Sequence, residues 1–378
     1  MSTLGLSTPA MDEVFSPESL VTAMLEFESA LAKALADTGI APRERAEAVV
    51  AACSEPISNP RQILGTTWES GSPVIALVEL IEQRLDDEED ARWVHFGATS
   101  QDVIDTAHML LARRGLALLE VSVARTASLI RVAIESHRHQ PQIGRTFLQH
   151  AMPTLFSMRA ASWLDSLLHH LTAMRSARSA LAVQLGGPVG NLRAYGARGL
   201  DVSAALADLL DLEAPGLPWH TDRSRVWELV GAVERPVASV AKIATDIALL
   251  AQTDTGEISA RPGGSSSMAH KRNPIDAIRA LAAADIAAGA ARMIVGARPH
   301  ELDRGLGSWH VEWVALPLLF RSAAAAFEAA ETIFETIEID TAAMAARASA
   351  ADSDTTNELD TRLIDRVLDE SKQVLEER

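Results

Sequence analysis

Apolar residues recur along most of this chain with the spacing of an α-helix. In residues 236–252 they follow the pattern i, i+3, i+4, i+7, which places them on one face of a helix that must be buried. Strict alternation of apolar and polar residues, which is typical of strands, is nearly absent. The helical pattern recurs in residues 20–36, 103–121, 160–182, 275–294 and 315–337. We therefore predict an all-α fold.

Alanine fills many of these faces, and small side chains let helix axes approach closely. This composition favours a bundle of long helices. Ser16 followed by Pro17 predicts a helix start. Thr221 or Asp222 is a candidate cap for a further helix, which we expect to kink or break at Pro236. The polar tail from residue 349 ends in a last amphipathic segment, residues 359–375.

The composition excludes some classes of partner. The 378 residues carry a formal charge of −17, which disfavours nucleic acid because its binding depends on clustered Lys and Arg. The single cysteine, Cys53, excludes an intramolecular disulfide and suits a reducing compartment. We find no signal-peptide pattern and no apolar segment free enough of charge to span a membrane. The sequence therefore predicts a cytoplasmic protein.

Residues 263–274 read GGSSSMAHKRNP and form the loop with the strongest candidate functional residues. Its two glycines permit motion or a close approach of backbone amides to a ligand. The Gly/Ser composition alone is equally compatible with a flexible linker. A lysine, an asparagine and a helix-initiating proline at fixed spacing behind the serines favour a binding loop, because a helix start with nearby cations attracts an anion.

Four other stretches mix polar side chains with Gly, Pro or Trp. In HFGATSQDVIDTA, from position 95, Thr99, Ser100 and Gln101 precede an apolar-periodic helix, so they can cap it or bind an oxyanion at its start. Each of the remaining stretches could also be a surface turn. They are GRTFLQHAMPTLF from position 144, PWHTDRSRVWEL from position 218 and PHELDRGLGSWHVEW from position 299. The histidines have no metal-site spacing, so we predict no metal.

Together these stretches resemble the fumarase/aspartase superfamily, whose members carry a G-S-S-x-M-x-x-K-x-N-P loop. The matching positions are Gly264, Ser265, Ser266, Met268, Lys271, Asn273 and Pro274. The HFGATSQD and GRTFLQ stretches are similar to the superfamily's two other motif regions, in the expected order, so the resemblance covers roughly residues 10–340. It implies a long-helix bundle assembled as a homotetramer, with active sites shared between subunits.

Within the superfamily, the motifs most resemble the branch of bacterial 3-carboxy-cis,cis-muconate cycloisomerases, which act in protocatechuate degradation. Adenylosuccinate lyase is the near competitor. That lyase normally has a histidine where this chain has Phe147 and a glutamate where it has Ile278. A third hypothesis is a catalytically inactive helical scaffold, suggested by Ala269, where the family usually has proline, and by a shortened C-terminus.

The resemblance also implies roles for individual residues. Ser265 is expected to carry the proton, with Lys271 as the nearby cation. A small tricarboxylate substrate is expected to contact His95, Thr99, Ser100, Gln101, Arg145, Thr146, Gln149, His220, Asn273 and Arg304. No cofactor is expected, because ring closure and protonation involve no hydride, electron or metal-bound water.

The resemblance finally implies how the chain is divided. We expect an N-terminal helical domain in residues 1–98, a central long-helix bundle domain in residues 99–338 and a short remnant of a C-terminal helical domain in residues 339–378. Family members generally continue with a further helical domain beyond the segment that matches Ile339, so the C-terminal domain is expected to be truncated.

Overall fold

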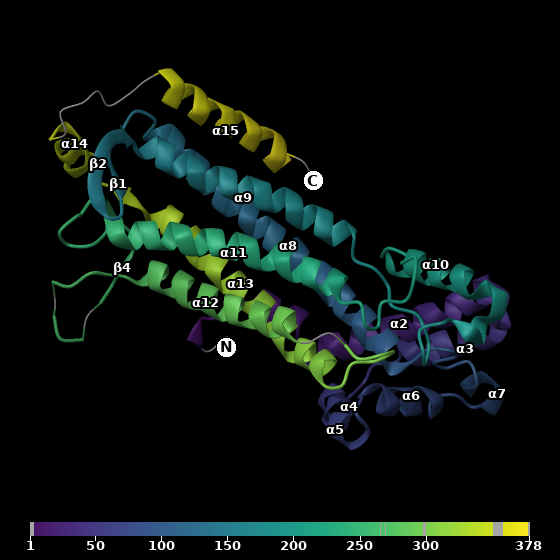
Figure 1. Cartoon of the computed structure of the whole chain (residues 1–378). Coiled ribbons are helices and arrows are strands. Elements are labelled where there is room, and N and C mark those ends of the chain that lie inside the picture. Colours follow the sequence, from purple (N-terminus) through teal and green to yellow (C-terminus); the bar gives the residue numbers. More distant parts are fainter. Residues whose placement is uncertain (1–3, 265, 269, 298–299, 351–357, 377–378) are drawn as a thin grey trace.

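Five long helices run side by side along the molecule and form its central bundle (Figure 1). The structure is a computed structural model that describes residues 4–264, 266–268, 270–297, 300–350 and 358–376. The bundle helices are α8 (Ser100–Ser136), α9 (Phe156–Ser179), α11 (Ser224–Leu250), α12 (Ile275–Gly296) and α13 (Ser308–Thr336). Each of the six segments with helical periodicity falls on a helix, although three of them run past the helix end, so the prediction of an all-α bundle is confirmed.

The small side chains explain how closely the bundle helices approach one another. Most of the buried residues of α12 are alanines, and α13 also has many buried alanines. Small side chains at the contact allow the two helices to pack closely. Gly115 of α8 lies against the ring of Phe320 from α13, and a Cβ atom at Gly115 would stand 2.7 Å from that ring. A glycine at this position lets the two helices meet.

Shorter helices surround the first turns of α8 and form one end of the molecule, on the right in Figure 1. The longest is α2 (Pro17–Asp37), which packs against α8, α3 and α10. Its N-cap is Ser16, whose hydroxyl accepts a hydrogen bond from the Ser19 amide at 3.0 Å, as the sequence predicted. The others at this end are α3 (Arg43–Ser54), α4 (Pro60–Gly65), α5 (Thr67–Ser70), α6 (Val74–Glu82), α7 (Glu88–Ala91), a 3₁₀ helix (Arg193–Arg198) and α10 (Gly199–Leu210).

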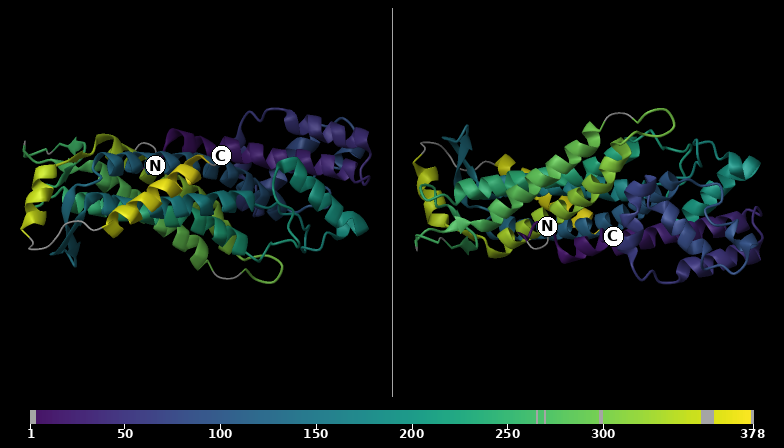
Figure 2. Two further views of the ribbon diagram at one scale, coloured as in Figure 1. Left: turned by 90° about the horizontal axis from the view of Figure 1, so that it is seen from above. Right: turned by 90° about the horizontal axis from the view of Figure 1, so that it is seen from below.

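The opposite end of the elongated molecule carries its few strands (Figures 1 and 2). The antiparallel hairpin of β1 (Pro141–Thr146) and β2 (Gln149–Leu155) joins α8 to α9. Two minimal pairs complete this end, β3 (Ile258–Ser259) with β6 (Glu338–Ile339) and β4 (Pro262–Gly263) with β5 (Asn273–Pro274). Three further helices are α1 (Pro9–Val14) against α8 and α13, α14 (Thr341–Ser349) against the hairpin, and α15 (Glu358–Glu376) along α9.

Three details differ from the sequence-based expectations. α11 continues from Ser224 to Leu250 without a break at Pro236, because α9, α12 and α13 pack against it and hold its course. The N-cap of α11 is Arg223 rather than Thr221 or Asp222, although Asp222 accepts a hydrogen bond from the Ser224 amide at 3.1 Å. The β1–β2 hairpin was missed, because its strands lack the strict alternation that marks a strand in sequence.

By length and composition, α13 alone among the described helices could cross a membrane. However, 67% of its most apolar window is buried inside the protein, against α8, α11 and α12. Its hydrophobicity is therefore accounted for by its place in the core.

Candidate active site

Asp102 joins three separate segments at the start of α8. Its carboxylate accepts hydrogen bonds from the Thr99 amide at 3.0 Å and the Gly187 amide at 2.9 Å. The first bond completes a capping box, in which Thr99 is the N-cap of α8. The imidazole Nε2 of His220 lies 2.6 Å from the other Asp102 oxygen, and both side chains are buried. One carboxylate thus holds together the loops around residues 95–99, 186–190 and 218–223.

The glycine-rich loop at residues 186–190 can approach this helix start only because it lacks side chains. Gly187 has φ +72°, and a Cβ atom there would stand 2.6 Å from the carbonyl oxygen of Gly97. Gly97 in turn has φ +75° and faces the ring of Tyr195. The two loops are therefore in direct backbone contact at the helix N-terminus.

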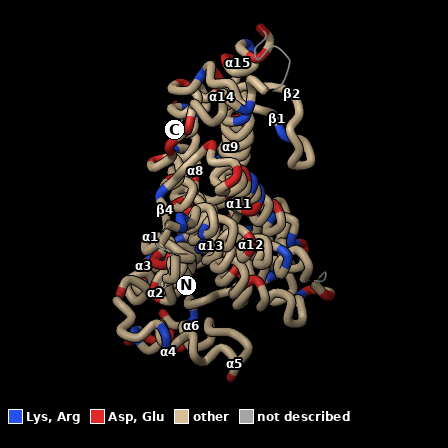
Figure 3. Tube along the Cα trace, turned by 90° about the vertical axis from the view of Figure 1, so that its left-hand side faces the viewer, with Lys and Arg blue, Asp and Glu red and all other residues tan. Residues whose placement is uncertain are grey.

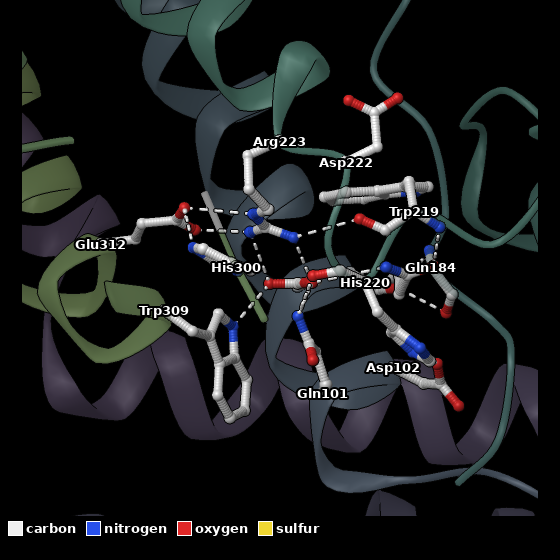
Figure 4. A network of polar contacts seen from close by, with 12 residues as sticks. Gln101, Asp102, Gln184, Trp219, His220, Asp222, Arg223, His300, Trp309 and Glu312 are labelled. Atoms are coloured by element: carbon white, nitrogen blue, oxygen red, sulfur yellow. Dashed lines mark hydrogen bonds and ion pairs between the residues drawn. The ribbon is translucent and has the colours of Figure 1, made fainter. Parts of the chain in front are cut away.

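A buried network of charged and polar groups lies one turn further along α8 (Figure 4). The Arg223 guanidinium binds Asp105 with two hydrogen bonds, at 2.8 and 3.0 Å, and binds both oxygens of Glu312 on α13. The indole of Trp309 donates to Asp105 at 2.9 Å. All four side chains are almost completely buried. The arrangement joins α8, the N-cap of α11 and α13 through ion pairs that are shielded from water.

The pKa values in this network follow from burial and from the number of donors. Burial raises the pKa of Asp105, but the Arg223 charge and the Trp309 hydrogen bond outweigh it, so the net pKa is lowered. Glu312 has fewer donors, and burial leaves its pKa raised. One turn further along α8, burial lowers the pKa of His108 to about 4, so this imidazole is neutral at pH 7.

Gln101 and His220, two of the residues predicted to bind substrate, are buried in the same place. The Gln101 side-chain amide donates to the His220 carbonyl oxygen at 2.8 Å and to Asp105 at 3.1 Å. Gln101 Oε1 and His220 Nδ1 have no hydrogen-bond partner among the described residues. We call Gln101, Asp102, Asp105, His220, Arg223 and Glu312 the α8-cap cluster.

Three other predicted residues lie beside this cluster. The Arg304 guanidinium donates to the Thr99 hydroxyl at 2.8 Å, and Ser100 is the first residue of α8. His95 is half-buried and has a positive φ of 53°. Its Nδ1 lies 2.6 Å from the buried carboxylate of Glu28. One end of the molecule therefore brings together six of the predicted residues: His95, Thr99, Ser100, Gln101, His220 and Arg304.

Arg145 lies at the opposite end, on β1, and is already paired within the chain. Its guanidinium donates to Glu257 at 3.1 Å and through a second, shorter bond, and Glu257 is completely buried. Gln142 also donates to Glu257, at 3.0 Å, and accepts from Arg159 at 2.8 Å. In the single chain, Arg145 fixes the base of the hairpin; its predicted contact with substrate stays a prediction.

The tip of the hairpin is exposed. Thr146 and Gln149 flank Phe147 and Leu148, which have positive φ angles of 50° and 62°. The Phe147 side chain is 99% exposed, an unusual state for a large apolar ring. Figure 3 looks onto this end of the molecule, with β1 and β2 at its upper right.

The serine-rich loop lies at the same end as the hairpin. Lys271 is exposed, and Asn273 on β5 donates from its side chain to the Gly264 carbonyl oxygen at 3.2 Å. Ser265 and Ala269 lie outside the described residues. A cavity of about 800 Å³ opens at the base of this loop and is lined in part by Arg261 and Asn273. We call Arg145, Thr146, Gln149, Lys271 and Asn273 the hairpin-end residues.

The two groups of predicted residues are far apart in one chain. Thr99 caps the start of α8 and Arg145 follows its end, and the 37 residues of α8 span roughly 55 Å at about 1.5 Å per residue. The loop with Lys271 precedes α12 at the hairpin end, as Figure 1 shows. No small substrate can contact both groups within a single chain.

Several residues that organise these groups were not among the predicted site residues. Asp102 had a recognisable signal, because Thr99-x-x-Asp102 matches a capping-box pattern. Arg223 and Glu312 stood in stretches already selected for mixing Trp with charge. Glu28 and Glu257 had no local signal, since their partners are 67 and 112 residues away in sequence.

Comparison with known proteins identifies the family. The family described as "Lyase" matches residues 3–286. This chain belongs to that lyase family, the fumarase/aspartase superfamily. The lyase-family chain is 40% identical to the 3-carboxy-cis,cis-muconate cycloisomerase of Pseudomonas aeruginosa over 337 residues, which is 87% of this chain and 73% of that protein. It is 38% identical to the enzyme of that name from Bradyrhizobium diazoefficiens, covering 90% of this chain and 77% of that protein.

Solved structures lead to the same family. The lyase-family chain matches the crystal structure of 3-carboxy-cis,cis-muconate lactonizing enzyme from Pseudomonas putida with a TM-score of 0.84 and 35% identity. The match covers 92% of this chain and 78% of that one. A fumarate lyase from Mesorhizobium sp. BNC1 matches with a TM-score of 0.83 and 31% identity, over 91% and 78% of the two chains. The predicted superfamily is therefore confirmed.

Proposed function

We propose that this chain is an enzyme that closes 3-carboxy-cis,cis-muconate to 4-carboxymuconolactone. The observation that carries the proposal is its likeness to four 3-carboxy-cis,cis-muconate cycloisomerases, which are 34–40% identical over 86–90% of the chain. The serine-loop motif and the two other motif regions fall within the matched residues 3–286. Adenylosuccinate lyase matches at 30% identity over 71% of the chain, which does not favour that alternative.

The reaction is an intramolecular addition. A carboxylate oxygen of the substrate bonds to an alkene carbon, and the π electrons move to the neighbouring carbon. The negative charge there spreads into the attached carboxylate, and a proton completes the lactone. The enzyme must therefore hold three carboxylates, stabilise the charge that develops and deliver one proton. No cofactor takes part in these reaction steps.

In this proposal the hairpin-end residues act on the developing charge. Lys271 and Asn273 bind the carboxylate whose charge increases, and Ser265 carries the proton. A donor aimed in advance at such a charge typically contributes about 3 kcal/mol to transition-state stabilisation. Thr146, Gln149 and Arg145 bind other carboxylate oxygens. Phe147 and Ile278 are exposed at this end, where the competing lyase has its histidine and glutamate, which supports the cycloisomerase over that lyase.

The residues around the α8-cap cluster bind the rest of the substrate, but on another copy of the chain. We propose a homotetramer in the cytoplasm whose active sites combine His95, Thr99, Ser100, Gln101, His220 and Arg304 of one copy with hairpin-end residues of others. The distance between the two groups in one chain supports such sharing, and so does the exposed Phe147 at the hairpin tip.

The direct test is to add 3-carboxy-cis,cis-muconate to the purified protein and follow the loss of its diene absorbance. We expect rapid loss and formation of the lactone. A folded, assembled protein that leaves the diene unchanged would overturn the proposal. Release of fumarate from adenylosuccinate under the same conditions would establish the competing activity instead.

Sharing of the site can be tested by mixing two inactive variants. Arg304→Gln disables the α8-cap end and Lys271→Gln disables the hairpin end. If each site combines ends from different copies, mixed assemblies of the two variants regain part of the activity that neither has alone. If both ends of a site came from one chain, mixing would restore nothing. Lys372→Gln, on the exposed surface of α15, is the control for each preparation.

A further inference from the structure

Glu28 and His95 form an isolated carboxylate–imidazole pair beside the start of α8. Glu28 lies in the middle of α2, and its side chain is completely buried. One of its oxygens lies 2.6 Å from His95 Nδ1, and the other accepts a hydrogen bond from the His95 backbone amide at 3.1 Å. Two contacts to one carboxylate fix both the backbone and the ring of His95.

The two contacts to Glu28 hold the His95 backbone in a conformation that the residue would not prefer by itself. His95 has φ +53°, a region that residues with a Cβ atom rarely adopt. The two bonds to Glu28 hold the residue there and set the direction of its ring. The neighbouring turn is closed by the Ala98 amide, which donates to the His95 carbonyl oxygen at 3.2 Å.

The second ring nitrogen remains available for a ligand. Nδ1 is used by Glu28, and Nε2 makes no hydrogen bond within the part of the chain that the structure describes. The His95 side chain is 20% exposed although its partner is completely buried, so the ring reaches from the interior to the surface. His95 stands four residues before Thr99, whose hydroxyl is held by Arg304.

We propose that Glu28 is a positioning residue that keeps His95 as a protonated donor, with Nε2–H directed at a carboxylate of the substrate. Charge-assisted hydrogen bonds of this kind are shorter and stronger than neutral ones. The inference rests on the proposed function for the substrate class, a tricarboxylate.

The charges around His95 agree with this assignment. Burial alone lowers the pKa of His95, but the charge and hydrogen bond of Glu28 outweigh it, and Asp102 on α8 and Glu82 on α6 add to the effect. The net pKa is raised above its ordinary value. A raised pKa means that the imidazolium persists as pH rises, so binding of an anion at Nε2 weakens only as pH passes the folded-state pKa.

The test measures the charge of His95 without using turnover. The imidazole Cε1–H signal of His95, assigned by its loss in His95→Gln, is followed by NMR from pH 5 to 9. We expect Glu28→Gln to move the titration of His95 to lower pH. Glu26→Gln is the matched control, since Glu26 lies on the same helix but pairs with the half-exposed Arg114. An unchanged His95 titration in Glu28→Gln would overturn the proposal.

A second measurement needs no substitution. Binding of propane-1,2,3-tricarboxylate to the assembled wild-type protein should weaken about tenfold or more as pH rises through the His95 transition. Affinity that does not follow this transition would also overturn the proposal. Absence of turnover on the muconate, with the titration shift and the pH-dependent binding intact, would overturn the proposed function and leave the Glu28–His95 assignment standing.

Discussion

The two ends of this molecule are built on different physical principles. The α8-cap cluster is buried, and its charges are paired within the chain through Arg223, Asp105 and Glu312. The hairpin end exposes Phe147, Lys271 and the other described residues of the loop between β4 and β5. The first end is organised before any ligand arrives. The second presents functional groups on the surface, where residues of another copy of the chain can complete the active site.

This contrast predicts that substitutions at the two ends differ in their effects on the free energy of unfolding and on turnover. A substitution in the α8-cap cluster should reduce the free energy of unfolding, because a buried charge that loses its partner keeps its desolvation penalty. A substitution of an exposed hairpin-end residue such as Lys271 should leave the free energy of unfolding almost unchanged and act on turnover, whereas Arg145 is an exception because it pairs with the buried Glu257. The following experiments test that division, from the largest expected effect to the smallest.

Arg223→Met should have the largest effect. It leaves Asp105 and Glu312 buried without their shared cation, which we expect to cost about 3–5 kcal/mol in the free energy of unfolding. Urea unfolding at fixed protein concentration measures the change. Arg198→Met removes an arginine from an exposed pair with Asp201 and should cost under about 0.5 kcal/mol. A similar, small loss for both variants would contradict the role of the buried network.

Lys271→Gln should show the opposite behaviour. We expect kcat to fall by about 10²–10³, roughly 3–4 kcal/mol of transition-state stabilisation, because the cation that faces the developing charge is gone. The urea midpoint should stay at the wild-type value, since Lys271 is exposed. Steady-state kinetics and urea unfolding of the same preparation measure both quantities. A large loss of stability with a normal kcat would contradict the proposed difference between the two ends.

His108 should make the stability of the α8 end depend on pH. Its folded-state pKa of about 4 lies below the ordinary value near 6.5, so the unfolded chain binds a proton that the folded one does not. Stability is complete above about pH 6.5 and is lost as pH falls toward 4. We expect a contribution of about 2 kcal/mol between pH 7 and pH 5. Comparison of urea unfolding of wild type and His108→Gln isolates it, and equal pH slopes would exclude it.

Trp309→Phe should have the smallest effect of the four. It keeps most of the buried ring but removes the indole donor to Asp105, which also accepts from Arg223, Gln101 and, at 3.5 Å, Gln184. The expected cost is about 1–2 kcal/mol in the free energy of unfolding, because one hydrogen bond to a charged group is lost. Thermal unfolding detects such a change. A cost as large as that of Arg223→Met would show that the indole, rather than the guanidinium, holds the network.

The sequence by itself determined the helices and the identity of the motif residues. Apolar spacing located the bundle, Ser16 marked the start of α2, and the pattern around Lys271 and Asn273 carried the family resemblance. These features depend on residues close together in the chain, so the one-dimensional pattern contains them.

Only the tertiary structure decided which charges meet and where the motifs lie. Glu28 with His95, and Arg145 with Glu257, are partners because helices and strands distant in sequence pack together. Packing also keeps α11 helical at Pro236, although proline disfavours the interior of a helix. The length of α8 placed the two groups of motif residues at opposite ends of one chain, because helical rise converts sequence separation into distance.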